Sequence, residues 1–303
     1  MSNTQIEYDY EEQFKDALAK LTDDGLKKKL VAIKKLAVKR LNLENEFKKE
    51  QNKLEYEYEQ KYKPLYEERR KLVAGDAKPD LEAIKDKLKE VGLKEEDAKG
   101  EEKEKGIPDF WLKCIENAHD ISELNDNDKK ILKFLKDVQI DLKENGDFKL
   151  IFKFEPNEYF DHTELTKEYK HDNQYDIKTV TSTKIEWKSS EKNPTIELKK
   201  KKMKNKKTKA IKVVTKEIKV PSFFSCFKDF EKKTKEANKK EDEDEEENEE
   251  EEDYDIEDDY DFGLLFKDEI IPFSIEYYLG IVEDDDKDGA DNDDDDDDED
   301  DDQ

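Results

Sequence analysis

The 303-residue sequence predicts an α+β protein, in which one long helix precedes short helices, an antiparallel sheet and closing helices. Apolar side chains after residue 24 recur at steps of three, four or seven, which is typical of one helix face. After residue 147 the apolar period changes to two, which is typical of strands with one buried face. Acidic residues gather in two blocks, which indicates that part of the chain lies outside any core.

The long helix is predicted over residues 22–74, after a flexible arm at 1–21. It would run about 60 Å from Asp24 to Lys63 at ~1.5 Å per residue, and Pro64 is expected to end or kink it. Such a helix outreaches a small domain, so we expect its stripe to pack on the same helix of a second chain. A solvent-facing helix within a monomer is the alternative. The predicted dimerisation residues are Leu26, Leu30, Ile33, Leu36, Leu43, Phe47, Leu54 and Tyr58.

A linker with one short helix at 81–91 is predicted over residues 75–106, before an α+β domain over 107–282. Its segment "NDNDKKILKFLKDVQI" predicts a helix with Asn125 or Asp126 as N-cap. Its strands are predicted in "DFKLIFKFE", "YDIKTVTSTKIEWK", "TIELKKKKM" and "AIKVVTKEIKV". The segment "DFGLLFKDEIIPFSIEYYLGIV" predicts one or two helices, bent or restarted at Pro272.

The net charge of −28 is very unevenly distributed along the chain. Residues 241–261 carry 17 acids and no Lys or Arg, residues 283–303 carry 16 acids and one Lys, and the remainder is slightly positive. Such blocks repel themselves, so we expect a disordered insert at 241–253 and a disordered tail at 283–303. Their expected partners are polycations, above all histones. High-affinity nucleic-acid binding is not expected, because it requires a basic footprint.

The sequence lacks the motifs of nucleotide, metal and nucleophile chemistry, so we expect no enzyme, cofactor or metal. The run "DDDKDGADNDDD" follows a calcium-loop pattern, but Asp replaces the bidentate Glu and no exit helix follows, which favours weak nonspecific cation binding. Cys114 and Cys226 lie in apolar runs and are expected to be buried thiols. No signal peptide or membrane-spanning run is recognisable, which predicts a soluble intracellular protein.

A lysine-rich hairpin tip, "KKKKMKNKKTK", is either a solvated turn or a nuclear import signal that import receptors read. The acidic blocks are able to mask it, and we expect a protein of both nucleus and cytoplasm. The predicted signal residues are Lys199, Lys200, Lys201, Lys202, Lys204, Lys206, Lys207 and Lys209.

Taken in order, several segments resemble the nucleosome assembly protein family of histone chaperones. They are "KYKPLYEERRKLVAG", "GIPDFWL", "FKFEPNEYF", "ELTKEY", "TKIEWK", the lysine-rich hairpin, "VTKEIKVPSFFSCF" and "KDEIIPFSIEYYLG", which together cover about Leu26 to Gly280. The chain departs from the family pattern in "PSFFSCFKDFEKK" and in its Asp-dominated tail. The related SET proteins share the fold, but "KPLYEERR" and the hairpin look closer to the nucleosome assembly branch.

The resemblance implies a homodimer joined through the long helix, and a four-stranded sheet with helices that form a dome. It also implies an acidic underside that binds core histones and deposits them on DNA without ATP. A SET-type inhibitor of an enzyme such as a phosphatase is the alternative, and an acidic calcium buffer is a third. The predicted histone-binding residues, by position in the family pattern or in the tail, are Asp126, Asp128, Asp255, Glu257, Asp258, Asp259, Asp261, Glu283, Asp284, Asp285 and Asp286.

Overall fold

The computed structural model describes residues 12–94, 105–119, 121, 124–172, 176–204, 211–231 and 255–282, and gives the backbone alone at 201–204 and 211–214. The insert at 241–253, the tail at 283–303 and the calcium-like run therefore lie outside the described residues. So do Lys206, Lys207 and Lys209 of the hairpin tip.

The long helix α2 spans Asp24–Val73, and its N-cap Asp23 accepts hydrogen bonds from the amides of Gly25 and Leu26. Pro64 lies inside it, so of the two expected effects of this proline, an end or a kink, the end of the helix is excluded. A proline removes one backbone hydrogen bond from a helix. Contacts with the folded domain before and after Pro64 stabilise the helix across this missing bond. Residues 12–19 are also helical, so this part of the predicted flexible arm is ordered.

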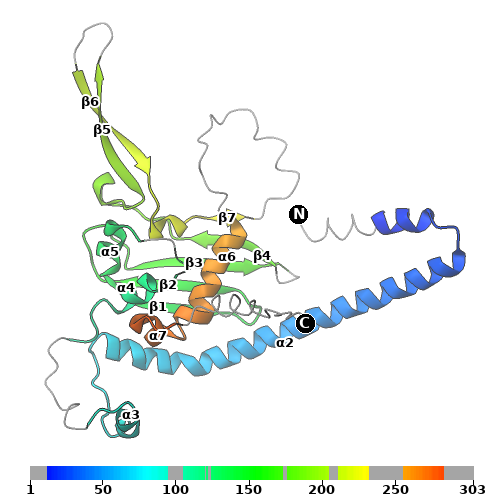
Figure 1. Ribbon diagram of the computed structural model, residues 1–303, viewed down its shortest axis with the longest axis horizontal. Helices are drawn as coiled ribbons and strands as arrows, with labels where there is room; N and C mark the ends of the chain where they lie inside the picture. Colours follow the sequence, from blue (N-terminus) through cyan, green and yellow to red (C-terminus); the bar gives the residue numbers. More distant parts are fainter. Residues whose placement is uncertain are drawn as a thin grey trace, which may run out of the picture.

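Only the C-terminal half of α2 lies along the folded domain, whereas its N-terminal half runs past the edge of the sheet (Figure 1). The Asn52 amide donates to the carbonyl of Asn145 at 3.1 Å, and the Lys63 ammonium lies 3.7 Å from the Asp141 carboxylate. Near the end of the helix, Arg69 donates to the carbonyl of Ile271. The helix is therefore joined to the domain over its second half.

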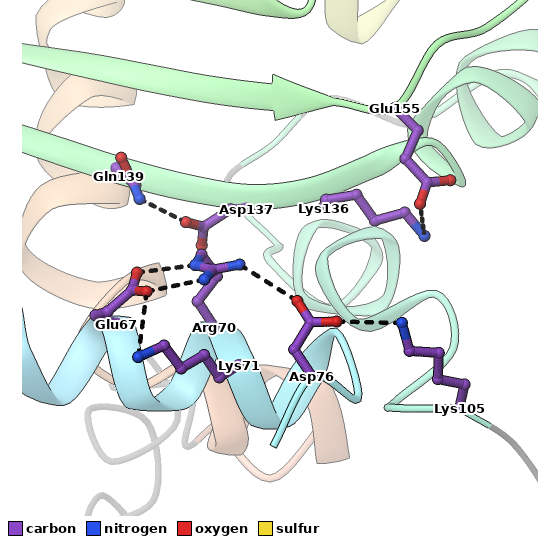
Figure 2. Close-up of polar contacts among 9 residues, drawn as sticks. All are labelled: Glu67, Arg70, Lys71, Asp76, Lys105, Lys136, Asp137, Gln139 and Glu155. Atoms are coloured by element: carbon purple, nitrogen blue, oxygen red, sulfur yellow. Dashed lines mark hydrogen bonds and ion pairs between the residues drawn. The ribbon is translucent and has the colours of Figure 1, made fainter.

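The two ends of the segment between α2 and the domain lie next to each other, at the C-terminal end of α2. The Ile107 amide donates to the Val73 carbonyl at 2.8 Å, and between them lies the short helix α3, Lys85–Glu90, inside the range predicted for a helix. Figure 2 shows the ion pairs at this junction: Arg70 reaches Glu67 at 2.8 Å and Asp76 at 3.8 Å. The Arg70 guanidinium hydrogen-bonds Glu67 and lowers the pKa of that carboxyl to about 2.

The central sheet is antiparallel, in the strand order β1-β2-β3-β4-β7. It has four full strands and one short edge strand, β7. The family resemblance implied a four-stranded sheet, and β7 adds a fifth strand at its edge. The bounds are β1 Leu135–Leu142, β2 Phe148–Phe154, β3 Glu164–His171, β4 Ile177–Ser182 and β7 Phe230–Glu231. Alternate side chains of β2 are buried, from Phe148 to Phe154, as the period of two predicts.

Two strand predictions need correction. The segment "LKDVQIDL", whose first six residues were expected to continue a helix, is β1, because its alternate apolar side chains enter the core beside β2. The lysine-rich strands β5, Ile196–Lys204, and β6, Ile211–Lys219, pair only with each other within the described chain. They form a separate hairpin that projects away from the domain (Figure 1). Five of the nine residues of β5 are lysines, which are rarely buried, so this strand is poorly suited to the core.

Helices cover the buried face of the sheet. Phe266 meets Phe152 of β2 edge-on, with ring centroids 5.1 Å apart. Cys114 and Cys226 are free and buried, as the apolar runs around them predicted. None of the described helices combines the length and apolar character needed to cross a bilayer. The covering elements are α4 Phe110–Glu116, α5 Asp126–Leu132, the 3₁₀ turn η3 Phe223–Cys226, α6 Ile256–Leu264, the π-helix η5 Leu265–Ile270 and α7 Ser274–Leu279.

Candidate functional site

The acids predicted at 255–261 lie at the start of α6, which crosses the sheet (Figure 1). The N-cap Asp255 accepts hydrogen bonds from the amides of Glu257 and Asp258, at 2.8 and 3.1 Å. In return, the Asp258 carboxylate accepts the Asp255 amide at 2.9 Å. This capping box and the positive end of the helix dipole stabilise the helix and its concentrated negative charge.

Helical periodicity divides the acids of α6 into two sets. Ile256, Asp259 and Gly263 are buried on the face toward the sheet. Asp255, Glu257, Asp258 and Asp261 are exposed. In the sequence, the apolar residues Tyr254, Ile256, Tyr260 and Phe262 alternate with acids, which predicts that Asp259 lies with the outward-facing acids. The helix instead turns Asp259 inward.

Asp259 forms a fully buried ion pair with Lys167 of β3, with the Lys167 ammonium 2.8 Å from the Asp259 carboxylate. The same ammonium donates to the carbonyl of Cys226 in η3. Asp259 therefore fastens α6 to the sheet and does not lie on the surface, which corrects its predicted role in histone contact. The pair is compensated by direct charge contact and a second hydrogen bond, as buried charges require.

Two further contacts fix the position of α6. A Cβ added to Gly263 would lie 2.5 Å from the Tyr169 ring, so only glycine allows this close approach. The Tyr260 hydroxyl lies 3.0 Å from Nε2 of His171, and Nδ1 of that histidine lies 3.2 Å from Asp147. The exposed acids of α6 are consequently held on a rigid support.

Acids from two other elements act electrostatically on Tyr260. Burial, together with the carboxylates of Asp268, Glu55 and Asp261, raises the pKa of Tyr260 to about 12. Glu55 comes from α2 and Asp268 from η5, and both side chains are exposed. Sequence analysis missed both, because nothing distinguishes them from other charges in their segments. We call the exposed set the acidic edge: Asp255, Glu257, Asp258, Asp261, Asp268 and Glu55.

The two predicted acids of α5 also divide between surface and interior. Asp126 is exposed, and Asn125 is the N-cap, one of the two expected positions. Asp128 is fully buried and accepts hydrogen bonds from Oγ of Ser222 at 2.6 Å and from the Phe223 amide at 3.1 Å. Burial raises the pKa of Asp128, and these hydrogen bonds oppose the shift. Asp128 is thus a support of η3, which corrects its predicted role in histone contact.

The 3₁₀ turn η3 connects the two acidic elements. The Phe223 amide binds Asp128 of α5, and the Phe223 ring lies 6.1 Å from the ring of Phe262 in α6. The helices that carry Asp126 and the acids of α6 therefore both pack on η3. The remaining predicted acids, Glu283 to Asp286, lie outside the described residues.

The predicted dimerisation stripe is left uncovered by the folded domain. Seven of its eight side chains are exposed, with Leu36 at 63% and Phe47 at 68%, and Leu30 is half-buried. The opposite face of α2 carries Asn52 and Glu59, which are buried against the domain. The helix thus has one face for its own domain and one apolar face that the domain leaves largely exposed.

The fold and the acidic edge together define a class: an α+β protein with a long apolar-striped helix and acids fixed on a rigid helix. Comparison with known proteins identifies the family. Residues 28–281 match the family model described as Nucleosome assembly protein (NAP). The chain belongs to the nucleosome assembly protein family, which confirms the resemblance found in the sequence.

Relatives and solved structures agree with this assignment. The chain is 32% identical over 293 residues to Nucleosome assembly protein 1-like 4 of Mus musculus, covering 86% of this chain and 76% of the relative. It is 33% identical over 288 residues to Nucleosome assembly protein 1-like 1-A of Xenopus laevis, covering 86% and 71%. Among structures, Nucleosome Assembly Protein 1 from Plasmodium knowlesi matches with a TM-score of 0.54 and 26% identity, covering 86% and 100%.

Proposed function

We propose that this protein is an ATP-independent histone chaperone that acts in nucleosome assembly. Core histones bind to its acidic surfaces, which shield them from nonspecific contacts with DNA. The observation that supports this most directly is the acidic edge of six exposed carboxylates. Four of them belong to α6 and its N-cap, and the buried pair of Lys167 and Asp259 fastens α6 to the sheet. The sequence contains no Gly-rich phosphate loop, in agreement with a mechanism that consumes no nucleotide.

The mechanism follows from electrostatics. Histones and DNA associate strongly and without register, because each phosphate contact releases counterions. Exposed carboxylates occupy the same Lys and Arg side chains through contacts worth about 1 kcal/mol or less each. Many such contacts together give useful affinity while each stays exchangeable. Ordered DNA wrapping, which is tighter, then removes the histone from the chaperone.

Charge removal on the acidic edge tests this proposal. The triple variant Glu257→Gln, Asp261→Asn and Asp268→Asn removes three exposed charges and leaves the capping box intact. If each contact contributes about 0.5 kcal/mol, the dissociation constant for core histones rises about tenfold. Fluorescence anisotropy with labelled histones measures it.

The matched control also removes three exposed acids, one just before the remote helix α3 and two within it: Glu82→Gln, Asp86→Asn and Glu90→Gln. It should change the affinity far less. Equal loss in both variants would mean that net charge alone governs binding. A histone affinity that does not fall between low and high salt would show that apolar contacts dominate and would contradict the mechanism.

We further propose that two copies join through the stripe on α2. Burying side chains such as Leu36 and Phe47 contributes about 1.5–3 kcal/mol for each. The double variant Leu36→Lys and Phe47→Lys should sediment as a monomer at micromolar concentration, while the control Lys39→Gln and Lys49→Gln should stay dimeric. A monomeric unmodified protein would refute the assignment of this stripe.

The projecting hairpin supports a nuclear import signal, in line with a role at chromatin. Lys199 and Lys200 are exposed on β5, so an import receptor can reach them. Replacing the eight predicted lysines with glutamine should shift the protein from nucleus to cytoplasm, as measured by fluorescence microscopy of a tagged chain. An unchanged distribution would exclude the hairpin as the signal.

A further inference from the structure

A cleft of about 450 Å³ lies where the β5–β6 hairpin joins the domain, and no residue of the acidic edge belongs to its lining. Its walls come from the chain that follows β4, from the roots of the two hairpin strands, and from η3 with the residues after it. The apolar part of the lining consists of Ile185, Trp187, Ile196, Val220, Phe224 and Phe227. The volume is in the range of sites that hold one or two bulky groups.

The aromatic wall of the cleft is rigid. The Trp187 and Phe224 rings meet edge-on at 5.5 Å, and Phe224 stacks on Phe227 at 6.3 Å. Trp187 also pairs with Phe160 of the core through an isolated β-bridge. A wall that is already ordered loses little conformational entropy when a ligand binds.

The charged part of the lining is basic. Lys184, Lys219 and Lys228 are exposed and surround the apolar interior. The one acid in the lining, Asp229, already accepts the Ser182 amide at 2.6 Å. Further along the hairpin, Lys199 and Lys200 of β5 are also exposed. In a chain of net charge −28, this is a local surface of opposite sign.

We propose that this cleft binds a short acidic peptide of another protein, in which Asp or Glu residues flank one bulky apolar side chain. The lysines would pair with the acids while the apolar side chain enters the aromatic cleft. The protein's own acidic blocks fit this description less well, because 241–253 contains no apolar residue and 283–303 contains only Ala290. Tyr254, which follows the first block, carries a polar hydroxyl on its ring, and the competitor described below includes it. The proposed partner is therefore acidic, whereas a histone is basic, and the cleft acts independently of the acidic edge.

A peptide probe tests the proposal on the full-length protein. The labelled peptide DEDELDEDE carries one leucine among acids, and its matched control replaces that leucine with alanine. Anisotropy at about 0.1 M salt should give at least tenfold tighter binding for the leucine peptide, as expected for burial of one large apolar side chain. Acrylamide quenching provides a second readout, because of the two tryptophans Trp187 lines the cleft and Trp111 is buried. The leucine peptide should protect Trp187 from the quencher.

Charge reversal tests the basic rim. The double variant Lys184→Glu and Lys228→Glu changes exposed side chains only and should lower the affinity at least tenfold. The control Lys78→Glu and Lys89→Glu introduces the same charge change near α3 and should lower it much less. Equal effects of the two variants would overturn the proposal.

Two competitors distinguish other occupants. One competitor is a synthetic peptide of residues 241–254. If it displaces the labelled probe as effectively as the unlabelled leucine peptide does, the proposal of a separate partner protein is overturned in favour of the protein's own acidic block. A 12-nucleotide single strand that displaces it equally well would overturn the choice of a peptide, since stacking and phosphate contact would then suffice. Weak displacement by both supports the proposal.

Discussion

The buried pair of Lys167 and Asp259 is expected to determine whether α6 stays on the sheet. Replacing Lys167 with methionine keeps most of the side-chain volume and leaves the Asp259 carboxylate buried without its cation. Both side chains are 0% exposed and 2.8 Å apart, so neither gains compensation from water. Breaking such a pair costs about 3–5 kcal/mol. For a domain of this size, that lowers the melting temperature by roughly 10 °C.

A double-mutant cycle gives the assay, with urea unfolding followed by circular dichroism. Lys167→Met and Asp259→Leu should each destabilise strongly, while the double variant should recover much of the loss, because it leaves no unpaired charge. Histone affinity supplies a second readout: α6 carries most of the acidic edge, so Lys167→Met should weaken histone binding, unlike a destabilising substitution elsewhere. A single variant that costs less than about 1 kcal/mol would refute the reasoning.

Three further substitutions have expected effects on stability. Burial raises the pKa of Glu59 from 4.5 to about 6, although the nearby Lys63 lowers it. Protonated Glu59 therefore contributes to the free energy of unfolding fully below pH 4.5, and this contribution is lost as the pH rises through 6. Glu59→Gln should therefore stabilise by up to about 2 kcal/mol at pH 8 and by nothing at pH 4, which urea unfolding at both values checks. Gly263→Ala should cost about 1–3 kcal/mol, because the added Cβ meets the Tyr169 ring; an unchanged melting temperature would contradict that contact. Asn125→Ala removes the α5 cap and should cost about 0.5–2 kcal/mol by the same assay, and Lys130→Ala on the same helix is its control.

The sequence predicts those parts of the fold whose pattern is local. The stripe of α2 follows from spacing alone, and Asn125 is recognisable as an N-cap from its place before an acidic first turn. β1 was missed because "ILKFLKDVQI" continues an apolar helical spacing, and the change to a strand occurs within two residues after Leu132. The decisive factor is the partner strand β2, which no local pattern reveals.

The candidate site shows the same division. The acids of α6 were recognised by their density, but which of them face outward depends on the period of the element. Read as alternating, Asp259 falls with Asp255 and Asp261; read at 3.6 residues per turn, it joins Ile256 and Gly263 inside. Its buried state also depends on Lys167, 92 positions away in sequence. An ion pair between such distant positions cannot be recognised in any single segment of sequence. It nevertheless determines which carboxylates are exposed and able to contact a partner.

Three neighbouring positions on α2 connect the proposed dimer to the acidic edge. Leu54 belongs to the exposed stripe, Glu55 adds its charge beside Tyr260, and Tyr56 packs against the core. The helix backbone fixes the relative directions of these three side chains, because successive residues point about 100° apart. Pairing two such helices would therefore fix the separation of two acidic edges as well as joining the chains. A histone surface that contacts both edges would gain from multivalency, whereas a monomer offers one edge alone.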